Sequence, residues 1–493
     1  MGLSMRRREA IVAGMWLRTF MAGVLCGVAA SGAARGDSYT GAAWAVHFNL
    51  PDQTTSAGSI GPDEFLIRDR FLARIEALGS GDWACLTTFT FSGNTASGGA
   101  AGPVLEAIQR ALARGARVGF AVDKGVDISS NFWPGVSLRS LSLQAGNKLE
   151  LAQAPPASSI MHHKLGVFWY RTAQEAWVLS GSWNFTGGAS SQQWNILTEI
   201  QNNALGSASS NEMRELLSGH FHSNPAKSTA HDGSRFRLAG MDRDGWVRFG
   251  PFDGVYTGNN ALTDIVAAIG EAEDEIFFAL NKLTRQDVVD ALIAACNRGV
   301  IIEGVIPKSD RSQPSHASYE MYQRLKDPAN YTTRNRVRMV EAYYDAPRTR
   351  LDNINRDLVH TKYMVIDPRG ARPMVIHGSA NWTASALVLK SLNDENVQFL
   401  PHRGMAEAFR VHFARMTDGM KPWCDWRPGG GLSTFRLAYW LPAAETYEVV
   451  WTENLRAPGS WTNRVQILPI LRGTNSVEIP RAGGQRFYRI QPL

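Results

Sequence analysis

Two short segments of this chain carry residue types that are suited to phosphate chemistry. The first reads MHHKLGVFW and contains His162 and Lys164, and the second reads VHTKYMVID and contains His360 and Lys362. An imidazole can attack phosphorus or carry a proton, and an ammonium group can neutralise a phosphate oxygen. A single His-x-Lys pattern arises by chance in many proteins, so its repetition is the feature that needs an explanation.

The repetition continues downstream of both histidines. GSWNFT supplies Ser182 and Asn184, and GSANWT supplies Ser379 and Asn381, at nearly the same spacing from each histidine. Hydroxyl and amide groups can donate hydrogen bonds to the oxygens of a phosphate. Two linked patterns that recur in the same order indicate a duplicated site.

An acidic residue follows each asparagine at a similar distance. WNILTEI contains Glu199, and LNDENVQ contains Glu395. A carboxylate that accepts a hydrogen bond from the far ring nitrogen would fix the tautomer of a catalytic histidine. We therefore expect Glu199 and Glu395 to fill this role. His163 is expected to face away from the site, as a packing or surface residue.

These residue types match what cleavage of a phosphodiester requires. The reaction needs an in-line nucleophile, an acid for the leaving oxygen and positive charge near the other phosphate oxygens. Two imidazoles in opposite protonation states could fill the first two roles, and the lysines, asparagines and serines could hold the phosphate. The sequence offers no carboxylate cluster suited to a metal ion, so no metal or other cofactor is expected.

The elements around these residues are also repeated. VLEAIQRALARGARVGFAV and DVVDALIAACNRGVIIEGV each predict an amphipathic helix, a glycine that ends it and a buried strand. GDWACLTTFTF and EDEIFFALNKL predict a further buried strand before each helix. We expect the His-x-Lys segments on strands, where both side chains would share one face, and a surface loop over 138–160.

Alternation of strands and helices predicts an α/β lobe with a parallel or mixed sheet in each half of the chain. The expected lobes span 38–235 and 236–425, with SNPAKSTAHDGS as the linker between them. After a Gly-rich stretch, short alternating runs predict a small all-β module over 427–493. This module has no cluster of residues suited to catalysis, so a structural or docking role is expected.

HTKYMVID, GSANWT and NDEN together resemble the His-x-Lys-x4-Asp and Gly-Ser-x-Asn signature of the phospholipase D superfamily. The resemblance covers both lobes, about residues 60–400. It implies two pseudo-symmetric lobes packed around a two-fold axis, with the active site between them. It also implies a phosphohistidine intermediate, for which we assign His162 as the nucleophile and His360 as the acid.

The first copy departs from this signature at one position. The second copy ends in Asp367, whereas the first has Trp169 in its place. On a continuous strand the acid would face away from Lys362, so its expected role is to support the local backbone. The reacting set of the first lobe is intact, which favours an active enzyme over a degenerate lobe.

The N-terminus predicts an export signal. MRRREA is positively charged, TFMAGVLCGVAA is apolar, and SGAARG offers small residues for cleavage near residue 34. A cleaved signal over 1–34 implies a secreted or periplasmic protein. Four arginines and one glutamate lie in that segment, so its removal lowers the formal net charge from +6 to +3.

A charge so close to neutral does not favour a polyanionic substrate. We therefore expect an exported phosphodiesterase that hydrolyses the head group of a phospholipid at a membrane surface, as a monomer with no obligate protein partner. Three alternatives stay open: a nuclease, a transphosphatidylase or cardiolipin-synthase-like transferase, and an inactive phosphate-binding protein. Aromatic residues near the motifs could line a lipid-facing rim or belong to the core; these are Phe132, Trp133, Trp169, Trp183 and Trp382.

Overall fold

The fold is taken from a computed structural model of the chain. It describes residues 37–49, 65–93, 99–132, 135–191, 193–222, 232–251, 260–307, 313–333, 335–340, 358–388, 392–418, 423–428, 434–441, 447–452, 463–468, 473–480 and 487–492. The expected export signal and most of the expected linker lie outside these residues. None of the helices in the described ranges has the length and apolar character needed to cross a membrane.

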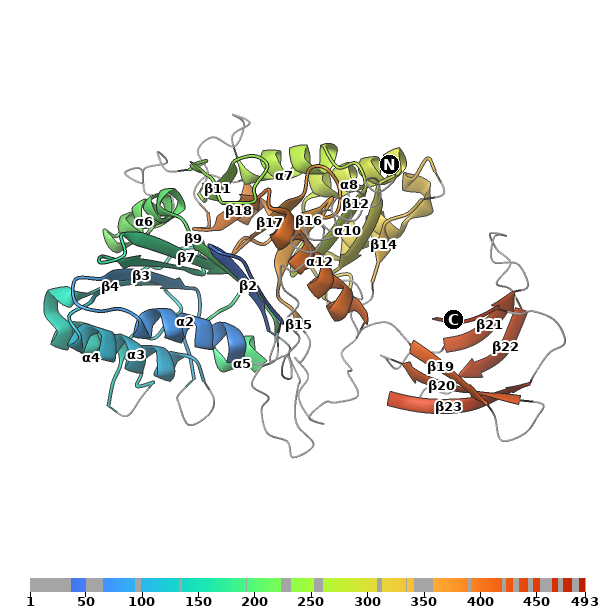
Figure 1. The fold of residues 1–493 in the computed structure, drawn as a ribbon, viewed down its shortest axis with the longest axis horizontal. Coiled ribbons are helices and arrows are strands. Elements are labelled where there is room, and N and C mark those ends of the chain that lie inside the picture. Colours follow the sequence, from blue (N-terminus) through green and yellow to red (C-terminus); the bar gives the residue numbers. More distant parts are fainter. Residues whose placement is uncertain are drawn as a thin grey trace, which may run out of the picture. The chain divides into compact units, whose positions relative to one another are not determined.

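The first lobe is built on an eight-stranded mixed sheet with the order β1-β2-β9-β7-β6-β3-β4-β5. Its strands are β1 (Asp37–Thr40), β2 (Trp44–Phe48), β3 (Trp83–Thr88), β4 (Arg117–Val122), β5 (Leu149–Gln153), β6 (Leu165–Tyr170), β7 (Glu175–Gly181) and β9 (Ile196–Gln201). Its helices are α2 (Leu66–Glu76), α3 (Ala101–Ala113), α4 (Leu138–Ala145), the 3-10 turn η3 (Gly146–Lys148), α5 (Gly187–Ser191) and α6 (Asn203–Leu217). Helices α2 and α3 cover one face of the sheet and α6 covers the other (Figure 1).

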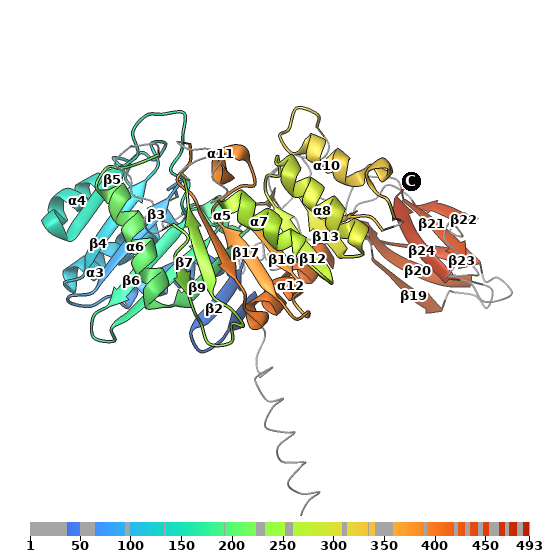
Figure 2. The same cartoon turned by 90° about the horizontal axis from the view of Figure 1, so that it is seen from above.

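The second lobe repeats this plan with the order β10-β11-β18-β17-β16-β12-β13-β14. Its strands are β10 (Arg235–Phe236), β11 (Gly245–Phe249), β12 (Glu275–Leu280), β13 (Ile301–Val305), β14 (Arg338–Met339), β16 (Lys362–Ile366), β17 (Met374–Gly378) and β18 (Asn396–Leu400). Its helices are α7 (Ala261–Gly270), α8 (Gln286–Arg298), α10 (Tyr319–Lys326), the 3-10 turn η4 (Pro328–Asn330), α11 (Ala384–Leu387) and α12 (Arg403–Asp418). Figure 2 shows α7 and α8 lying across this sheet.

The two sheets correspond strand by strand. In each, the three strands at one edge are parallel and the remaining neighbours are antiparallel. This arrangement confirms the predicted architecture of two α/β lobes.

The helix ends explain why the repeated RG pairs matter. Both α3 and α8 are followed by a glycine with positive φ, +93° at Gly115 and +111° at Gly299, a backbone conformation that glycine adopts without strain. The arginine before each glycine donates to backbone carbonyls at the end of the helix that comes earlier in the chain, α2 or α7. Arg114 binds the carbonyls of Ile75, Glu76 and Leu78, and Arg298 binds those of Ile269, Gly270 and Ala272. The predicted helix, glycine and strand are therefore present in both lobes.

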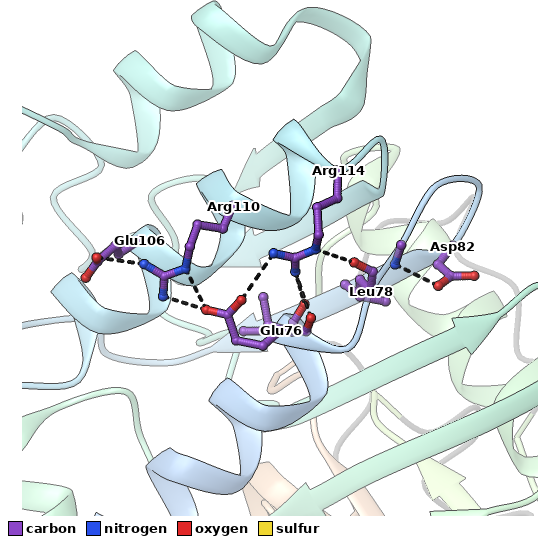
Figure 3. Close-up of polar contacts among 8 residues, drawn as sticks. Glu76, Leu78, Asp82, Glu106, Arg110 and Arg114 are labelled. Carbon is purple, nitrogen blue, oxygen red and sulfur yellow. Dashed lines mark hydrogen bonds and ion pairs between the residues drawn. The ribbon is translucent and has the colours of Figure 1, made fainter.

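Helix α3 is tied to α2 by further ion pairs in the first lobe. The Glu76 carboxylate accepts from Arg110 and Arg114, and Arg110 also binds Glu106 of its own helix (Figure 3). Such exposed pairs contribute little individually. The buried helix faces supply most of the stability of this contact, through side chains such as Ile75 and Leu105.

Strand β16 shows how the hydrophobic core is divided. Because successive side chains point to opposite faces, Met364 and Ile366 join the cluster under α7 and α8, whereas Tyr363 and Val365 face the other way. That second cluster also contains Phe48 and other residues of the first lobe. The inner faces of the two sheets therefore share one core, which fixes the lobes against each other.

Two local expectations need correction. Residues 138–160 are not simply a surface loop, since α4 and β5 lie there. The Ser137 side chain caps α4 through the backbone N–H of Ser140, and β5 extends the sheet beside β4. The His-x-Lys segments lead into the expected strands, but the histidines precede them: β6 begins at Leu165, directly after Lys164, and Lys362 is the first residue of β16.

Beyond α12 the described residues form strands. They make two three-stranded antiparallel sheets, of orders β19-β20-β23 and β22-β21-β24. The strands are β19 (Trp423–Pro428), β20 (Thr434–Leu441), β21 (Tyr447–Thr452), β22 (Asn463–Leu468), β23 (Gly473–Pro480) and β24 (Phe487–Pro492). A separate module over 427–493, like the other domain limits, stays a prediction.

Candidate active site

Each candidate histidine is placed by a short pairing with the opposite lobe. In the second lobe, β15 (Leu358–Val359) pairs in parallel with β8 (Gln193–Trp194) of the first lobe, and the His360 backbone N–H donates to Trp194. The His162 backbone N–H donates in the same way to Asp394 of the second lobe. These crossed pairings bring both His-x-Lys segments to the junction between the sheets.

His162 is bound by an acid of the second lobe. Its Nδ1 lies 2.7 Å from Glu395 Oε1, and the other carboxylate oxygen accepts from Ser379 Oγ at 2.6 Å. The Ser379 hydroxyl also accepts from the Asn396 backbone N–H, which ties the serine to the start of β18. Glu395 and Ser379 are fully buried, so the carboxylate is held rigidly behind the imidazole.

His360 is bound by an amide of the first lobe. Its Nδ1 lies 2.9 Å from Asn195 Oδ1, which also accepts from Ser182 Oγ at 2.8 Å. The Ser182 hydroxyl accepts from the Ile196 backbone N–H, at the start of β9. This network repeats that of the other lobe, with Asn195 in the place of Glu395.

The expected role of Glu199 is therefore wrong. Glu199 lies within β9, four residues beyond Asn195, and binds Arg70, Arg74 and His47 of its own lobe. Although burial opposes its ionised form, hydrogen bonds from His47 and Arg70 lower the pKa of Glu199. Glu199 was matched with Glu395 because both are acids, but the residue equivalent to Glu395 is Asn195, four positions earlier.

The two lysines lie at the same junction, and both are almost fully buried. Lys164 Nζ donates to the His162 carbonyl at 3.0 Å, and Lys362 Nζ donates to the His360 carbonyl at 2.6 Å. Within the described residues, each ammonium uses one of its three donors on this carbonyl. The remaining donors are suited to the oxygens of an anion.

Asn184 and Asn381 occupy equivalent turns after the serines. In each turn the backbone N–H of the threonine two residues later donates to the asparagine carbonyl, at 2.8 Å and 2.9 Å. Both side-chain amide oxygens are buried and have no hydrogen-bond partner in the part of the chain that the structure describes. Buried polar groups are normally satisfied, so these oxygens call for a donor. The Nδ2 group of each amide is the part that could donate to the oxygen of an anion.

The ionisable groups of the site disfavour one another's positive charge. Burial, followed by Lys164 and Lys362, holds the pKa of His162 well below its ordinary value, and burial with the same lysines does so for His360. Burial lowers the pKa of Lys164 to about 7 and also lowers that of Lys362, while it raises the pKa of Glu395 to about 7. A phosphate anion among these groups would favour their protonated forms.

Comparison with known proteins agrees with this geometry. The model of the family described as "Cardiolipin synthase, PLD-like domain" matches residues 85–217 and 265–417, which together exceed half of the chain. The chain belongs to the phospholipase D-like family. Each matched segment contains one His-x-Lys pair with its Gly-Ser-x-Asn turn. No curated protein matches the chain.

Several solved structures are similar to this chain at low identity. Phosphatidylserine synthase from Haemophilus influenzae Rd KW20 is 10% identical, with a TM-score of 0.48, over 76% of this chain and 85% of the synthase. Polyphosphate kinase from Porphyromonas gingivalis is 14% identical, with a TM-score of 0.46, over 76% of this chain and 50% of the kinase. Yeast tyrosyl-DNA phosphodiesterase is 13% identical, with a TM-score of 0.38, over 73% of this chain and 90% of that protein.

The acid of the phospholipase D-like signature lies outside the cluster of reacting groups. Asp367 follows β16, and its carboxylate accepts from the backbone N–H groups of Glu273, Asp274 and Glu275 at 2.8–2.9 Å. It therefore joins the end of β16 to the turn between α7 and β12. Trp169, at the equivalent position of the first lobe, stacks on Trp83 and donates to Ser210.

Sequence reasoning missed two residues of the site. Asn195 was missed because only acids were considered as partners for a histidine, although it directly precedes a strand just as Glu395 does. Phe89 was missed because no motif marks it; its ring centroid lies 4.9 Å from that of His162 and 5.5 Å from Lys164 Nζ. Its counterpart in the second lobe is Asn281, whose amide donates to the Val359 carbonyl.

Two other expectations concern neighbouring side chains. His163 does turn away from His162, and its Nε2 lies 3.0 Å from Glu212 in the shared core. Most of the aromatic residues considered for a lipid-facing rim belong instead to the core: Trp183, Trp382 and Phe132 are at most 9% exposed. Trp133 lies outside the described residues. Among those described, no group of three His, Cys, Asp or Glu side chains is arranged to hold a metal ion.

Proposed function

We propose that this protein is an exported, metal-independent phosphodiesterase of phospholipase D type that hydrolyses the head-group phosphodiester of a phospholipid. The observation that carries the proposal is the crossed support of the two histidines, each held at Nδ1 by a residue of the opposite lobe. With Nδ1 engaged, each ring is left with Nε2 for the substrate. Two imidazoles at one junction, each beside a buried lysine, suit in-line displacement at a phosphate.

In the proposed first step, His162 Nε2 attacks phosphorus as the bond to the leaving oxygen breaks. His360 gives the Nε2 proton to that oxygen, and the alcohol leaves. In the second step, His360 takes a proton from water, the hydroxide attacks phosphorus, and the bond to His162 breaks. Lys164, Lys362, Asn184 and Asn381 hold the non-bridging oxygens in both steps.

Glu395 supports the assignment of His162 as the nucleophile. Phosphorylation at Nε2 leaves the ring with a proton at Nδ1 and a partial positive charge. A carboxylate at 2.7 Å from Nδ1 would stabilise that charge. In its ionised form the same group accepts a hydrogen bond from Nδ1–H, so that Nε2 has a lone pair for attack.

Export and a lipid substrate are argued from the sequence. The proposed signal over 1–34 would place the enzyme outside the cytoplasm, and a net charge of +3 without it is low for a protein that binds polyanions. Nuclease and transferase activities need the same reacting groups. The products formed from each substrate distinguish these activities.

The test is product identification from a panel of phospholipids and DNA, with a chelator present throughout. We expect release of a soluble head group and formation of phosphatidic acid, at a rate that the chelator leaves unchanged. Added glycerol would reveal transfer, because phosphatidylglycerol would then form at the expense of phosphatidic acid. Cleavage of DNA with no attack on any lipid would overturn the proposed substrate.

A further inference from the structure

The two histidines have different partners at the same place in the fold. Behind His162 is the Glu395 carboxylate, and behind His360 is the neutral Asn195 amide, at 2.7 Å and 2.9 Å. Both partners are fully buried, both directly precede a strand, and both are bound by the serine of their own Gly-Ser turn. Only one of two otherwise equivalent imidazoles therefore has an ionisable carboxyl group at Nδ1.

The orientation of the Asn195 amide is fixed by its other contacts. Its Nδ2 donates to the Ala189 carbonyl at 2.8 Å, so its Oδ1 is the atom that faces His360 and the Ser182 hydroxyl. A carbonyl oxygen can only accept a hydrogen bond. His360 Nδ1 therefore keeps its proton in both charge states, and Nε2 is the atom that gains or loses a proton.

The surroundings of His360 bear on how easily Nε2 gives its proton up. Burial is the largest influence against the imidazolium form, and the charged and titratable groups that act on the ring also disfavour it; these are Lys362, Lys164 and His162. A contact with the Ser182 backbone works weakly in the opposite direction. An amide cannot offset the nearby cations as an ionised carboxylate would, so we infer that ionised Glu395 makes His162 the more basic ring and leaves the imidazolium of His360 the stronger acid.

We propose that Asn195 is the positioning residue that assigns opposite roles to the two histidines. With the neutral amide at Nδ1, His360 donates its proton readily to the leaving oxygen and recovers it from water. With the carboxylate at Nδ1, His162 is the ring that carries the phosphoryl group. This inference rests on the proposed phosphodiesterase chemistry but not on a lipid substrate.

The test uses bis(p-nitrophenyl) phosphate, a diester with no lipid part. Its first leaving group needs no acid, so the first step should give a burst of p-nitrophenolate, and breakdown of the phosphoenzyme should set the slower steady rate. That breakdown needs neutral His360 as the base, so the steady rate should rise with pH through the pKa of His360. Asn195→Asp places a carboxylate at Nδ1 and should move this rise to higher pH by about one unit.

Asn195→Ala is the matched control, because it removes the hydrogen bond without adding charge. It should lower the steady rate without moving the rise to higher pH. An effect of Asn195 on packing alone would slow both variants and leave the pH dependence of Asn195→Asp where it is in the wild type. That outcome would overturn the proposal.

A second measurement locates the phosphoryl group after an alkaline quench, which preserves phosphohistidine, by mass spectrometry of peptides. We expect it on His162 in the wild type, and a shift toward His360 in the double variant Asn195→Asp with Glu395→Gln. Phosphorylation of His360 in the wild type would contradict the assignment. Hydrolysis of the aryl diester without attack on any phospholipid would overturn the proposed lipid substrate and leave this inference standing.

Discussion

The two lobes share one strand order, but they join the end of one central strand to the turn before its neighbour in different ways. In the second lobe, Asp367 at the end of β16 accepts from three backbone N–H groups of the turn before β12. In the first lobe the acid comes from the turn and not from the strand end. Asp82, just before β3, accepts from the backbone N–H groups of Gly79 and of Arg171, which directly follows β6. Trp169 can therefore replace the acid of the signature without loss of the contact between strand and turn.

This difference bears on how a departure from a family signature is interpreted. The first copy lacks the acid, and a degenerate lobe was the alternative to the active lobe that its intact reacting set predicts. The structure shows that in this lobe Asp82 joins the turn before β3 to the end of β6. Lys164 and Asn184 keep the same local contacts as Lys362 and Asn381. The more consequential difference is the exchange of Glu395 for Asn195, which no signature includes.

The largest expected effect separates the two histidines. With a phospholipid that has an alkyl leaving group, His162→Ala and His360→Ala should each lower kcat/KM by about 10⁴-fold or more. With bis(p-nitrophenyl) phosphate, His360→Ala should retain a burst of about one p-nitrophenolate per enzyme, because this leaving group needs no acid, whereas His162→Ala should show none. His163→Gln, outside the reacting set, is the control. A burst from His162→Ala would contradict the division of roles.

The next effect concerns the stability of the site as a function of pH. The pKa of Lys164 falls from 10.5 to about 7 on folding, mainly through burial. Between these values the unfolded chain binds more protons than the folded protein, so stability increases as pH rises. Lys164→Met removes this dependence and should raise the melting temperature most near pH 7, with a smaller gain near pH 10. The gain should come with loss of activity.

Exposed Lys148→Met is the control for that experiment and should not alter the slope of melting temperature against pH. A second readout uses inorganic phosphate. It should raise the melting temperature of the wild-type protein and raise that of Lys164→Met less, because the anion favours a protonated lysine. Equal slopes of melting temperature against pH in the wild type and Lys164→Met would show that burial does not lower the pKa of Lys164.

How much of this could be predicted from the sequence depends on the kind of signal. The helices, the glycine caps and the central strands were predictable because periodicity and RG pairs act locally. The His, Lys, Ser and Asn residues were predictable because their spacing recurs. Asn195 was not, because its role arises from a contact between lobes with a residue 165 positions away. Glu199 was misassigned because acids were matched by type. The residue of the first lobe that is equivalent to Glu395 is Asn195, since each directly precedes the corresponding strand, β9 or β18.

A smaller effect compares Asp367 with Asp82, the acids that join a strand end to a turn in the two lobes. Asp367→Asn keeps the shape and tolerates the positive φ of this residue, +44°, but removes the charge that receives three N–H groups. It should lower the free energy of unfolding by about 1–3 kcal/mol. Asp82→Asn, with two such contacts, should cost less. Chemical denaturation of both variants measures the difference, and a larger loss in Asp82→Asn would reverse the proposed ranking.

The smallest expected effect concerns the two arginines that bind the backbone carbonyls at the end of α2 and at the end of α7. Arg114 and Arg298 reach equivalent carbonyls, but Arg114 also pairs with the Glu76 carboxylate, as does Arg110 (Figure 3). If the carbonyl contacts dominate, Arg114→Ala and Arg298→Ala should each cost about 1 kcal/mol. Glu76→Gln, which removes only the exposed ion pairs, should then cost about 0.5 kcal/mol or less and lose that effect in high salt. A cost for Glu76→Gln equal to that of Arg114→Ala would instead assign the stability of this contact to the ion pairs, and would make the first lobe the more salt-sensitive of the two.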